Sequence, residues 1–160
     1  MKRCIFIGQA MPKIKTDLHD WPSLNTWLYS IGINDKQIKK YFYYSALVDY
    51  FPGAKNGTHR VPSLAEIEKE RPRLKETIIN FNPRIIVPIG RLSIAHCLNQ
   101  PIQPLINDVG KIYETDPYLL LGKKKLIIPL PHPSGASTWK HKSKNNKLLL
   151  KTLKLLRLSL

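Results

Sequence analysis

IIVPIGRLSIAHCL, residues 85–98, is the stretch of sequence that decides the fold. Its first part, Ile85 to Ile89, is a short apolar run and predicts a strand that is buried on both faces. Gly90 ends this strand, and Arg91 to Leu98 then predicts a helix. A buried strand followed at once by a helix is typical of a parallel sheet covered by helices.

Three further apolar runs repeat this alternation of strand and helix. They are rich in Ile, Val, Leu or aromatic residues, and they span Cys4 to Ile7, Phe42 to Val48 and Leu126 to Leu130. The pattern predicts one α/β domain over residues 1–160. We expect a three-layer α/β/α sandwich around a four-stranded, mainly parallel sheet, with strand order 2-1-3-4 when the strands are numbered along the chain.

Helical patterns lie between these strands. Leu24 to Ile31 has apolar residues at helical spacing, with Gly32 as its stop. Ser63-Leu64-Ala65-Glu66 is a capping box that opens a helix toward Asn80, and Pro72 predicts a kink or a restart within that helix. The stretch from Tyr50 to Pro62 is interpreted as a long loop, and loops of that length in compact domains are usually functional.

The C-terminal stretch predicts an amphipathic helix. Its leucines fall on one stripe and its cations on another, namely Leu149, Leu153, Leu156 and Leu160 against Lys147, Lys151, Lys154 and Arg157. One interpretation is a helix that binds a membrane surface or a partner protein. The other, which we prefer because a compact domain needs a cover, is a closing helix that packs its leucines on the sheet.

The chain carries 26 Lys and Arg against 11 Asp and Glu, a formal net charge of +15. A positive field of this size attracts polyanions, so nucleic acid is the expected partner, and the alternative is that the lysines only solvate the surface. Cys4 and Cys97 are expected to be reduced core residues. No signal-peptide or membrane-span pattern is present, so we expect a cytoplasmic protein with no membrane partner. We also expect a monomer.

Two unusual loops follow the first and the fourth predicted strand. They are Gly8-Gln9-Ala10-Met11-Pro12 and Pro131-His132-Pro133-Ser134-Gly135-Ala136-Ser137-Thr138-Trp139. Ligands of open α/β sheets bind at the carboxyl ends of the strands, so both loops are expected to border one site. A histidine between two prolines has little freedom, which suits a group that donates a hydrogen bond in fixed geometry.

Together these loops resemble two motifs of the uracil-DNA glycosylase superfamily. The first loop is similar to the family's first motif, and His132-Pro133-Ser134 matches the His-Pro-Ser of its second. The order of the segments between them is also similar, namely the strand through Ser45, the Phe51-Pro52-Gly53 turn, Arg60-Val61-Pro62 followed by Glu66, and Ile86-Val87-Pro88-Ile89-Gly90. The resemblance covers about Arg3 to Asn146. It implies an enzyme of base-excision repair that hydrolyses the N-glycosidic bond of uracil or a related damaged base in DNA, without a cofactor.

The resemblance also implies roles for individual residues. His132 would be catalytic by donating a hydrogen bond to the base carbonyl oxygen, and Gln9 would orient the base or a water. The base pocket would include Gly8, Ala10, Met11, Ser45, Trp21 and Phe51. DNA would be bound by Pro133, Ser134, Gly135, Ser137, Trp139 and Lys140.

Two pocket positions depart from the family pattern. Ala10 stands where the best-known branch has the aspartate that activates water, which leaves Asp17 and Asp20 as substitutes if their loop folds over the pocket. Ser45 stands where several branches have an asparagine that reads the uracil edge. A serine hydroxyl forms fewer specific hydrogen bonds to a base edge than an asparagine amide does, so the sequence does not determine which base is preferred.

Two further departures concern the cofactor and the strand form of the substrate. Asp49 and Glu70 occupy two of the positions of the iron–sulfur cysteines of one branch, so we expect no cluster, and the histidine spacing predicts no metal site. Ala136 stands where the best-known members insert a leucine wedge into the duplex. Either Trp139 supplies the wedge or the substrate is single-stranded.

Other interpretations of the same residues remain. His132 could be a structural histidine that holds its loop, and Ser134 and Ser137 could be ordinary turn caps. The chain could be a nucleic-acid-binding module that kept the fold and lost the reaction, as Ala10 and Ser45 suggest. A nucleotide-binding domain acting on small molecules is less favoured, because the sequence has neither Gly-x-Gly-x-x-Gly nor a phosphate-loop motif.

Overall fold

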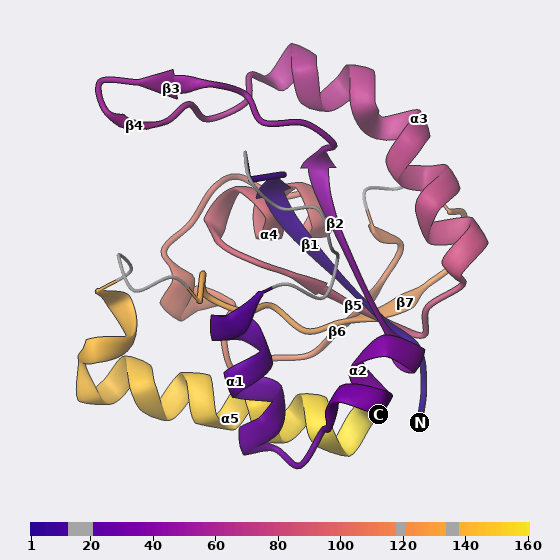
Figure 1. Ribbon diagram of the computed structural model, residues 1–160, viewed down its shortest axis with the longest axis vertical. Coiled ribbons are helices and arrows are strands. Elements are labelled where there is room, and N and C mark those ends of the chain that lie inside the picture. The colour runs from indigo at the N-terminus through magenta and orange to yellow at the C-terminus, as the bar shows by residue number, and fades with distance from the viewer. Residues whose placement is uncertain (13–20, 118–120, 134–137) are drawn as a thin grey trace.

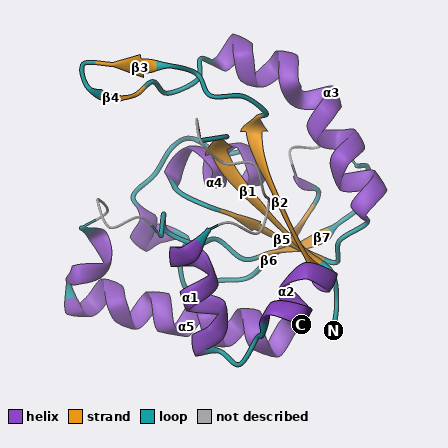
Figure 2. Cartoon of the chain, in the orientation of Figure 1, coloured by secondary structure: helices purple, strands orange, loops and turns teal. Residues whose placement is uncertain are grey.

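The protein has a five-stranded mixed sheet with helices on both faces (Figures 1 and 2). This computed structural model describes residues 1–12, 21–117, 121–133 and 138–160. The strands lie in the order β2-β1-β5-β7-β6, and all neighbours are parallel except β6 and β7. Their bounds are Cys4–Ala10 for β1, Phe42–Val48 for β2, Ile85–Pro88 for β5, Tyr113–Thr115 for β6 and Lys125–Ile127 for β7.

The four expected strands therefore exist, and they lie in the expected order. They correspond to β1, β2, β5 and β7, and Leu130 extends the pairing of β7 with β5 through an isolated bridge to Ile89. The expected strand count was wrong, because β6 adds a fifth, antiparallel strand at the edge. With three residues, none of them buried, β6 lacks the apolar run that marked the other strands.

Side chains of the central strands alternate between two cores, which confirms the three-layer arrangement. Cys4 and Phe6 of β1 join the core beneath α1 (Pro22–Ser30), α2 (Asp35–Tyr41) and α5 (Ser143–Ser159). Ile5 and Ile7 join the opposite core, beneath α3 (Leu64–Phe81) and α4 (Arg91–Leu98). Figure 1 shows α1, α2 and α5 in the lower part of the view and α3 curving along the upper right. The central strands are therefore buried on both faces, as predicted.

The helices begin and end at local sequence signals. In α3, Ser63 and Glu66 form the predicted capping box, with the Ser63 amide 2.7 Å from Glu66 Oε2 and the Glu66 amide 3.2 Å from Ser63 Oγ. After α1, Gly32 adopts a positive φ of 80°, as its predicted stop requires. Of the two outcomes expected at Pro72, a kink or a restart, the restart does not occur, because α3 continues through that residue.

Besides β6, a short helix and a hairpin were not predicted from the sequence. One is α2, which begins with a second capping box between Asn34 and Gln37. The other is a small hairpin of β3 (Ala54–Lys55) and β4 (Thr58–His59), joined by Asn56-Gly57, within the segment that we interpreted as a loop. Both turn residues have positive φ, 52° and 74°, which is the geometry that an Asn-Gly dipeptide favours in a two-residue hairpin turn.

The C-terminal helix closes one face of the sheet, as predicted. Leu149, Leu153 and Leu156 are buried in the core that α5 shares with α1 and α2. The two cysteines lie in opposite cores, Cys4 in this one and Cys97 beneath α4. Burial raises the pKa of both thiols. In the described ranges, none of the helices is both long and apolar enough to span a bilayer.

Candidate active site

The loops that follow β1 and β7 meet at the carboxyl edge of the sheet, with β5 between them. The end of β5 anchors the histidine loop, because the Leu130 amide donates to the Pro88 carbonyl at 3.0 Å and the Leu130 carbonyl accepts from the Gly90 amide at 2.9 Å. On the other side of β5, Ile89 donates to the Ile7 carbonyl at 2.9 Å. Ordinary ladder bonds therefore fix where both loops leave the sheet.

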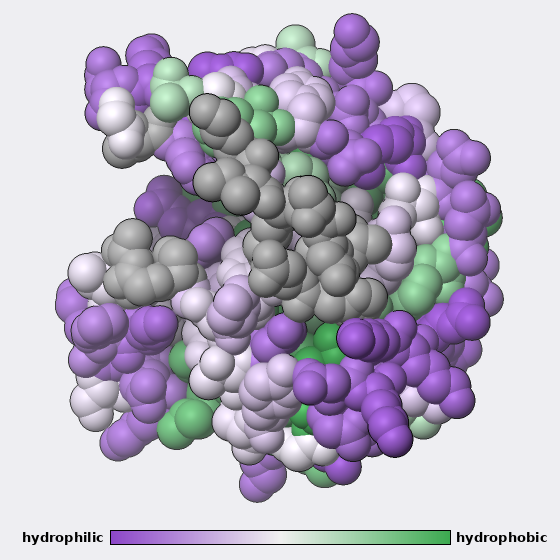
Figure 3. Space-filling view, in the orientation of Figure 1, coloured by the Kyte–Doolittle hydropathy of each residue, from purple (hydrophilic) through white to green (hydrophobic). Residues whose placement is uncertain are grey.

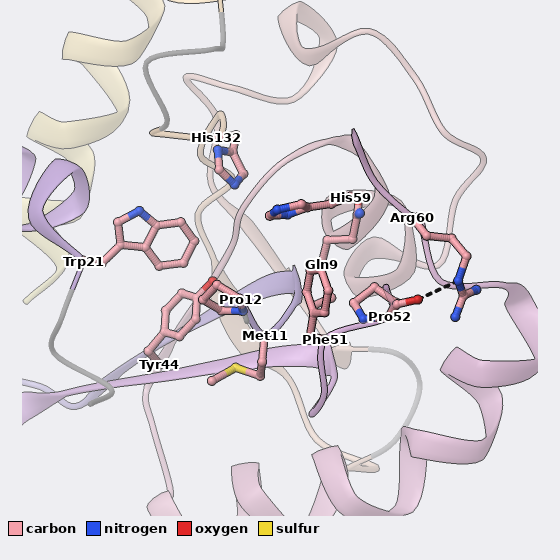
Figure 4. A pocket seen from close by; sticks show the side chains of 11 residues that line it. Gln9, Met11, Pro12, Trp21, Tyr44, Phe51, Pro52, His59, Arg60 and His132 are labelled. Atoms are coloured by element: carbon pink, nitrogen blue, oxygen red, sulfur yellow. Dashed lines mark hydrogen bonds between the residues drawn. The ribbon is translucent and has the colours of Figure 1, made fainter. Parts of the chain in front are cut away.

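A pocket of about 410 Å³ opens between these loops (Figure 4). This volume falls within the range of small-molecule sites. Its walls come from the end of β1 and the two residues after it, the residue before α1, strand β2, the segment that carries the hairpin, and the histidine loop. The first strand is longer than expected, so Gln9 and Ala10 lie in β1 and not in the loop that follows it. The lining residues are Gln9, Ala10, Met11, Pro12, Trp21, Tyr44, Phe51, Pro52, His59, Arg60 and His132.

Aromatic rings form two sides of the pocket. On one side, the Trp21 ring lies 4.5 Å from the Tyr44 ring and 5.6 Å from the His132 ring, measured between centroids. On the other, Phe51 and His59 meet edge to face, with centroids 5.2 Å apart. Figure 4 shows Trp21 and Tyr44 across the pocket from Phe51 and His59, with His132 beside them. Flat walls of this kind suit a planar aromatic ligand.

Tyr44 forms the floor of the pocket, and its ring fits there because Gly8 has no side chain. A Cβ atom built on Gly8 would collide with the Tyr44 hydroxyl, so the phenol crosses the strand where a side chain is absent. Tyr44 is 4% exposed, and its burial raises the pKa of the phenol. Gly8 is therefore beneath the pocket, not part of its lining.

The hairpin wall is held to the start of α3 by Arg60. Its guanidinium donates to Glu66 through Nη1 and Nη2, at 2.8 and 2.7 Å, and through Nε to the Pro52 carbonyl at 2.7 Å. Glu66 also accepts from the Ser63 amide at 2.7 Å and from the Tyr50 hydroxyl at 2.9 Å. The Arg60 hydrogen bonds, together with those from Ser63 and Tyr50, hold the pKa of Glu66 well below its usual range.

Besides His132, five residues of the predicted site line the pocket. They are Gln9, Ala10, Met11, Trp21 and Phe51. His132 is exposed and lines the same pocket as Gln9 and Ala10 of β1, so its ring does not point into the interior. The structure thus brings together the two loops whose meeting the sequence predicted.

Ser45 is not brought to the pocket. It is buried, and its Oγ lies 3.4 Å from Nη1 of Arg73, a residue of α3 on the opposite face of the sheet. Arg73 also donates to the Ala46 carbonyl at 2.7 Å, which ties α3 to β2. Tyr44, one residue earlier, takes the pocket side instead, because successive side chains of a strand point to opposite faces.

The predicted DNA-binding residues lie partly outside the pocket and partly outside the described residues. Pro133 is buried, and Trp139 and Lys140 lie in η3 (Trp139–His141), a short helix before α5. Trp139 borders a separate depression together with Arg91, Lys142 and Lys144. Ser134, Gly135, Ala136 and Ser137 lie outside the described residues, as do Asp17, His19 and Asp20.

The two positions compared with iron–sulfur cysteines form a polar contact. The Glu70 carboxylate accepts from the Asp49 amide at 3.2 Å and from Arg73 Nε at 2.6 Å. Iron–sulfur clusters are held by thiolates, so these residues do not fit one. Among the residues that the structure describes, no group of three or more His, Cys, Asp or Glu side chains is placed to hold a metal.

Five lining residues were not predicted from the sequence as members of the pocket, namely Pro12, Tyr44, Pro52, His59 and Arg60. His59 and Arg60 could have been found from the Asn56-Gly57 dipeptide, which predicts a hairpin that folds the segment back toward the sheet. Tyr44 carried no such signal, because its strand is apolar along nearly its whole length. Pro12 and Pro52 belong to motifs that resemble those of the family, but their side chains have no polar group that indicates a site.

Comparison with known proteins connects this geometry to a family. The sequence model of the uracil DNA glycosylase superfamily matches residues 2–157. A comparison with curated proteins found no match. The matched range contains both loops and every lining residue of the pocket. Because this match extends over nearly all of the 160 residues, the chain belongs to the uracil DNA glycosylase superfamily.

Proposed function

We propose that this protein is a DNA glycosylase that hydrolyses the N-glycosidic bond of uracil, or of a related deaminated or damaged base, in base-excision repair. The observation that carries the proposal is the aromatic-walled pocket of about 410 Å³, which has His132 at one side and Gln9 in its lining. Membership of the superfamily and the formal charge of +15 support DNA as the substrate.

The target base must leave the stack before the enzyme can reach its glycosidic bond. In the proposed reaction the flipped base enters the pocket between the Trp21 side and the Phe51 side. As the bond to the sugar breaks, negative charge grows on the base and positive charge on the sugar. His132 donates a hydrogen bond to the base carbonyl oxygen that gains charge, and so stabilises the leaving base.

Gln9 has a different part in this proposal. Its amide has a donor and an acceptor, so it orients the base or a water but cannot take a proton as a general base. Ala10 lines the pocket next to it and offers no acid or base. None of the described residues that line the pocket is a carboxylate, so in this proposal the stabilisation of the leaving base carries most of the rate.

The test is base release by the variant His132→Ala. We expect a rate at least about a hundredfold lower, because removing one preorganised donor costs on the order of 3 kcal/mol. The substrates are oligonucleotides with one uracil or one hypoxanthine, single-stranded and duplex, and cleavage after alkali reports the abasic sites. Single-turnover conditions with saturating enzyme remove differences in binding.

The matched control is His141→Ala, which removes an exposed histidine of η3 that is not in the pocket. It is expected to release the base at the parent rate. If His132→Ala is as fast as the parent on every substrate that the parent cleaves, His132 has no catalytic role.

A second candidate function is a nucleic-acid-binding module without glycosylase activity. Two observations favour it, namely Ala10 in the pocket and the contact of Ser45 with Arg73 on the far face of the sheet. The same oligonucleotides separate the two candidates. Retarded migration in a gel without any strand scission after alkali supports the binding module, and scission supports the enzyme.

A further inference from the structure

A second concave surface lies at the opposite edge of the sheet, where the strands begin. It has a volume of about 410 Å³ and is formed by the N-terminal segment, the turn between α3 and β5, strand β6 and the start of β7. Five cations and a single carboxylate border it, namely Lys2, Arg84, Lys123, Lys124 and Lys125, with Glu114. We call this surface the amino-edge cleft.

The cations of the amino-edge cleft are not neutralised by ion pairs within the described part of the chain. Lys125 is only 9% exposed, and its Nζ donates to the Pro83 carbonyl at 2.6 Å and to Asn82 Oδ1 at 3.4 Å. Burial lowers the pKa of Lys125, and the neighbouring charges of Lys123 and Arg84 lower it further. Carbonyl oxygens therefore hold this ammonium in place among like charges.

Like charges at close range repel each other, and an anion that binds among them relieves this repulsion. Its donors are of the kind that binds phosphate, since ammonium groups act as point charges and a guanidinium forms paired hydrogen bonds. The cleft is also too large to be filled by one phosphate group. A chain of phosphates fits the shape and the charge better than a single anion does.

The amino-edge cleft is far from the candidate active site. Strand β1 starts beside the cleft and ends at Ala10 in the pocket, and a strand of seven residues spans about 20 Å at ~3.3 Å per residue. DNA is stiff over such lengths, because its persistence length is about 50 nm. A duplex that lies across the pocket therefore does not bend round to the opposite edge of the sheet.

We propose that the amino-edge cleft binds the phosphodiester backbone of a second nucleic-acid segment, separate from the one at the candidate active site. The protein then holds two segments at opposite ends of its sheet. With two such contacts, the protein stays bound to DNA through one segment while it releases the other. The inference concerns binding alone and does not require that the pocket cleave a base.

The test is a titration of ¹⁵N-labelled protein with a lesion-free 12-base-pair duplex, followed residue by residue by NMR. We expect the amides of Arg84 and of Lys123 to Leu126 to shift on duplex binding. In the double variant Lys123→Gln/Lys124→Gln, the duplex should bind at these amides at least tenfold more weakly. The dependence of log K on log salt there should be shallower by about 1.8, at about 0.9 per phosphate contact.

The matched control is Lys36→Gln/Lys39→Gln, which removes two exposed charges from α2 and leaves the amino-edge cleft intact. This variant should bind the duplex at the cleft like the parent. The proposal is overturned if the parent amides do not shift, or if the control weakens binding as much as the cleft variant. It is also overturned if inorganic tripolyphosphate shifts these amides and the duplex does not, since the ligand is then a free polyphosphate.

Base release from a short uracil-containing oligonucleotide is measured in parallel. The cleft variant is expected to release the base at the parent rate, because Lys123 and Lys124 lie outside the candidate active site. A protein that releases no base but shows the cleft shifts contradicts the proposed function and supports this inference. A protein that releases the base but shows no shifts at the cleft amides supports the proposed function and contradicts this inference.

Discussion

At Gly8 the backbone of β1 passes directly beneath the Tyr44 hydroxyl, with no space for a side chain. We expect Gly8→Ala to destabilise the protein by about 1–3 kcal/mol, because overpacking a filled core costs about that much. The gain in strand preference over glycine offsets only part of it, about 0.5–1 kcal/mol. Urea unfolding of the variant and the parent measures the difference.

The control for this prediction is Tyr44→Phe, which removes the oxygen that the new methyl group would meet. In the double variant the next Tyr44 atom, Cζ, is 3.2 Å from the Cβ position, which is tight but needs only a small shift. We expect the double variant to be more stable than the sum of the single effects, by about 0.5–3 kcal/mol. Additive effects would show that the two residues do not compete for space.

Residue identities at the candidate site were partly predictable from the sequence. Gln9 and His132 stood out because glycine and proline mark the loops around them, and loops at strand ends carry ligand contacts. The sequence did not show whether Tyr44 or Ser45 faces the pocket. Strand β2 is buried on both faces, so its sequence shows no alternation of apolar and polar residues that would say which side chain faces the pocket.

At the scale of elements, the hairpin β3–β4 depends on one carboxylate. Glu66 binds Arg60, Ser63 and Tyr50, and the Arg60 hydrogen bonds are the main reason that its pKa is lowered. A group with a lowered folded pKa stabilises the fold above its unfolded pKa of about 4.3. That contribution is lost as the pH falls from there toward the folded pKa.

We therefore predict that Glu66→Gln flattens the acid limb of the stability profile. The free energy of unfolding of the parent should fall as the pH drops below about 4.5, and that of the variant should fall less over the same range, because glutamine does not titrate. Urea unfolding between pH 3 and pH 7 measures both profiles. Glu114→Gln is the control, since Glu114 is exposed and has no ion pair in the described residues. Parallel profiles for the parent and Glu66→Gln would contradict the prediction.

Elements that lie in an apolar run or have a long helical pattern were predictable, and short elements without an apolar run were not. The buried strands and α3 have a sustained apolar pattern or a capping box, so β1, β2, β5, β7 and their order followed from the sequence. The missed elements are α2, the hairpin and β6, with seven, two plus two, and three residues. None of these elements lies in an apolar run, and at this length they are stabilised by their contacts with the rest of the fold, so their own sequences carry little signal.

At the scale of the whole molecule, positive charge gathers at both ends of the sheet. The amino-edge cleft holds five cations, and at the carboxyl edge Arg91, Lys142 and Lys144 border the depression that contains Trp139. The space-filling view shows hydrophilic side chains over much of the surface, with a hollow between the hairpin and the first turn of α5 (Figure 3). If DNA lies across the pocket as proposed, the depression at the carboxyl edge is on the same side of the sheet as that DNA, whereas the amino-edge cleft is at the opposite edge.

This difference between the two ends gives the last prediction. If DNA next to the target base lies on the carboxyl-edge depression, Lys142→Gln/Lys144→Gln should lower kcat/KM for base release and make its salt dependence shallower by about 1.8, at about 0.9 per phosphate contact. The control Lys147→Gln/Lys154→Gln removes the same charge from exposed positions of α5 that do not border the depression. It should lower the rate only through the long-range field, which salt screens over about 10 Å at 0.1 M. Equal salt slopes for the two variants would mean that net charge alone brings DNA to the protein, and that Lys142 and Lys144 make no direct phosphate contact.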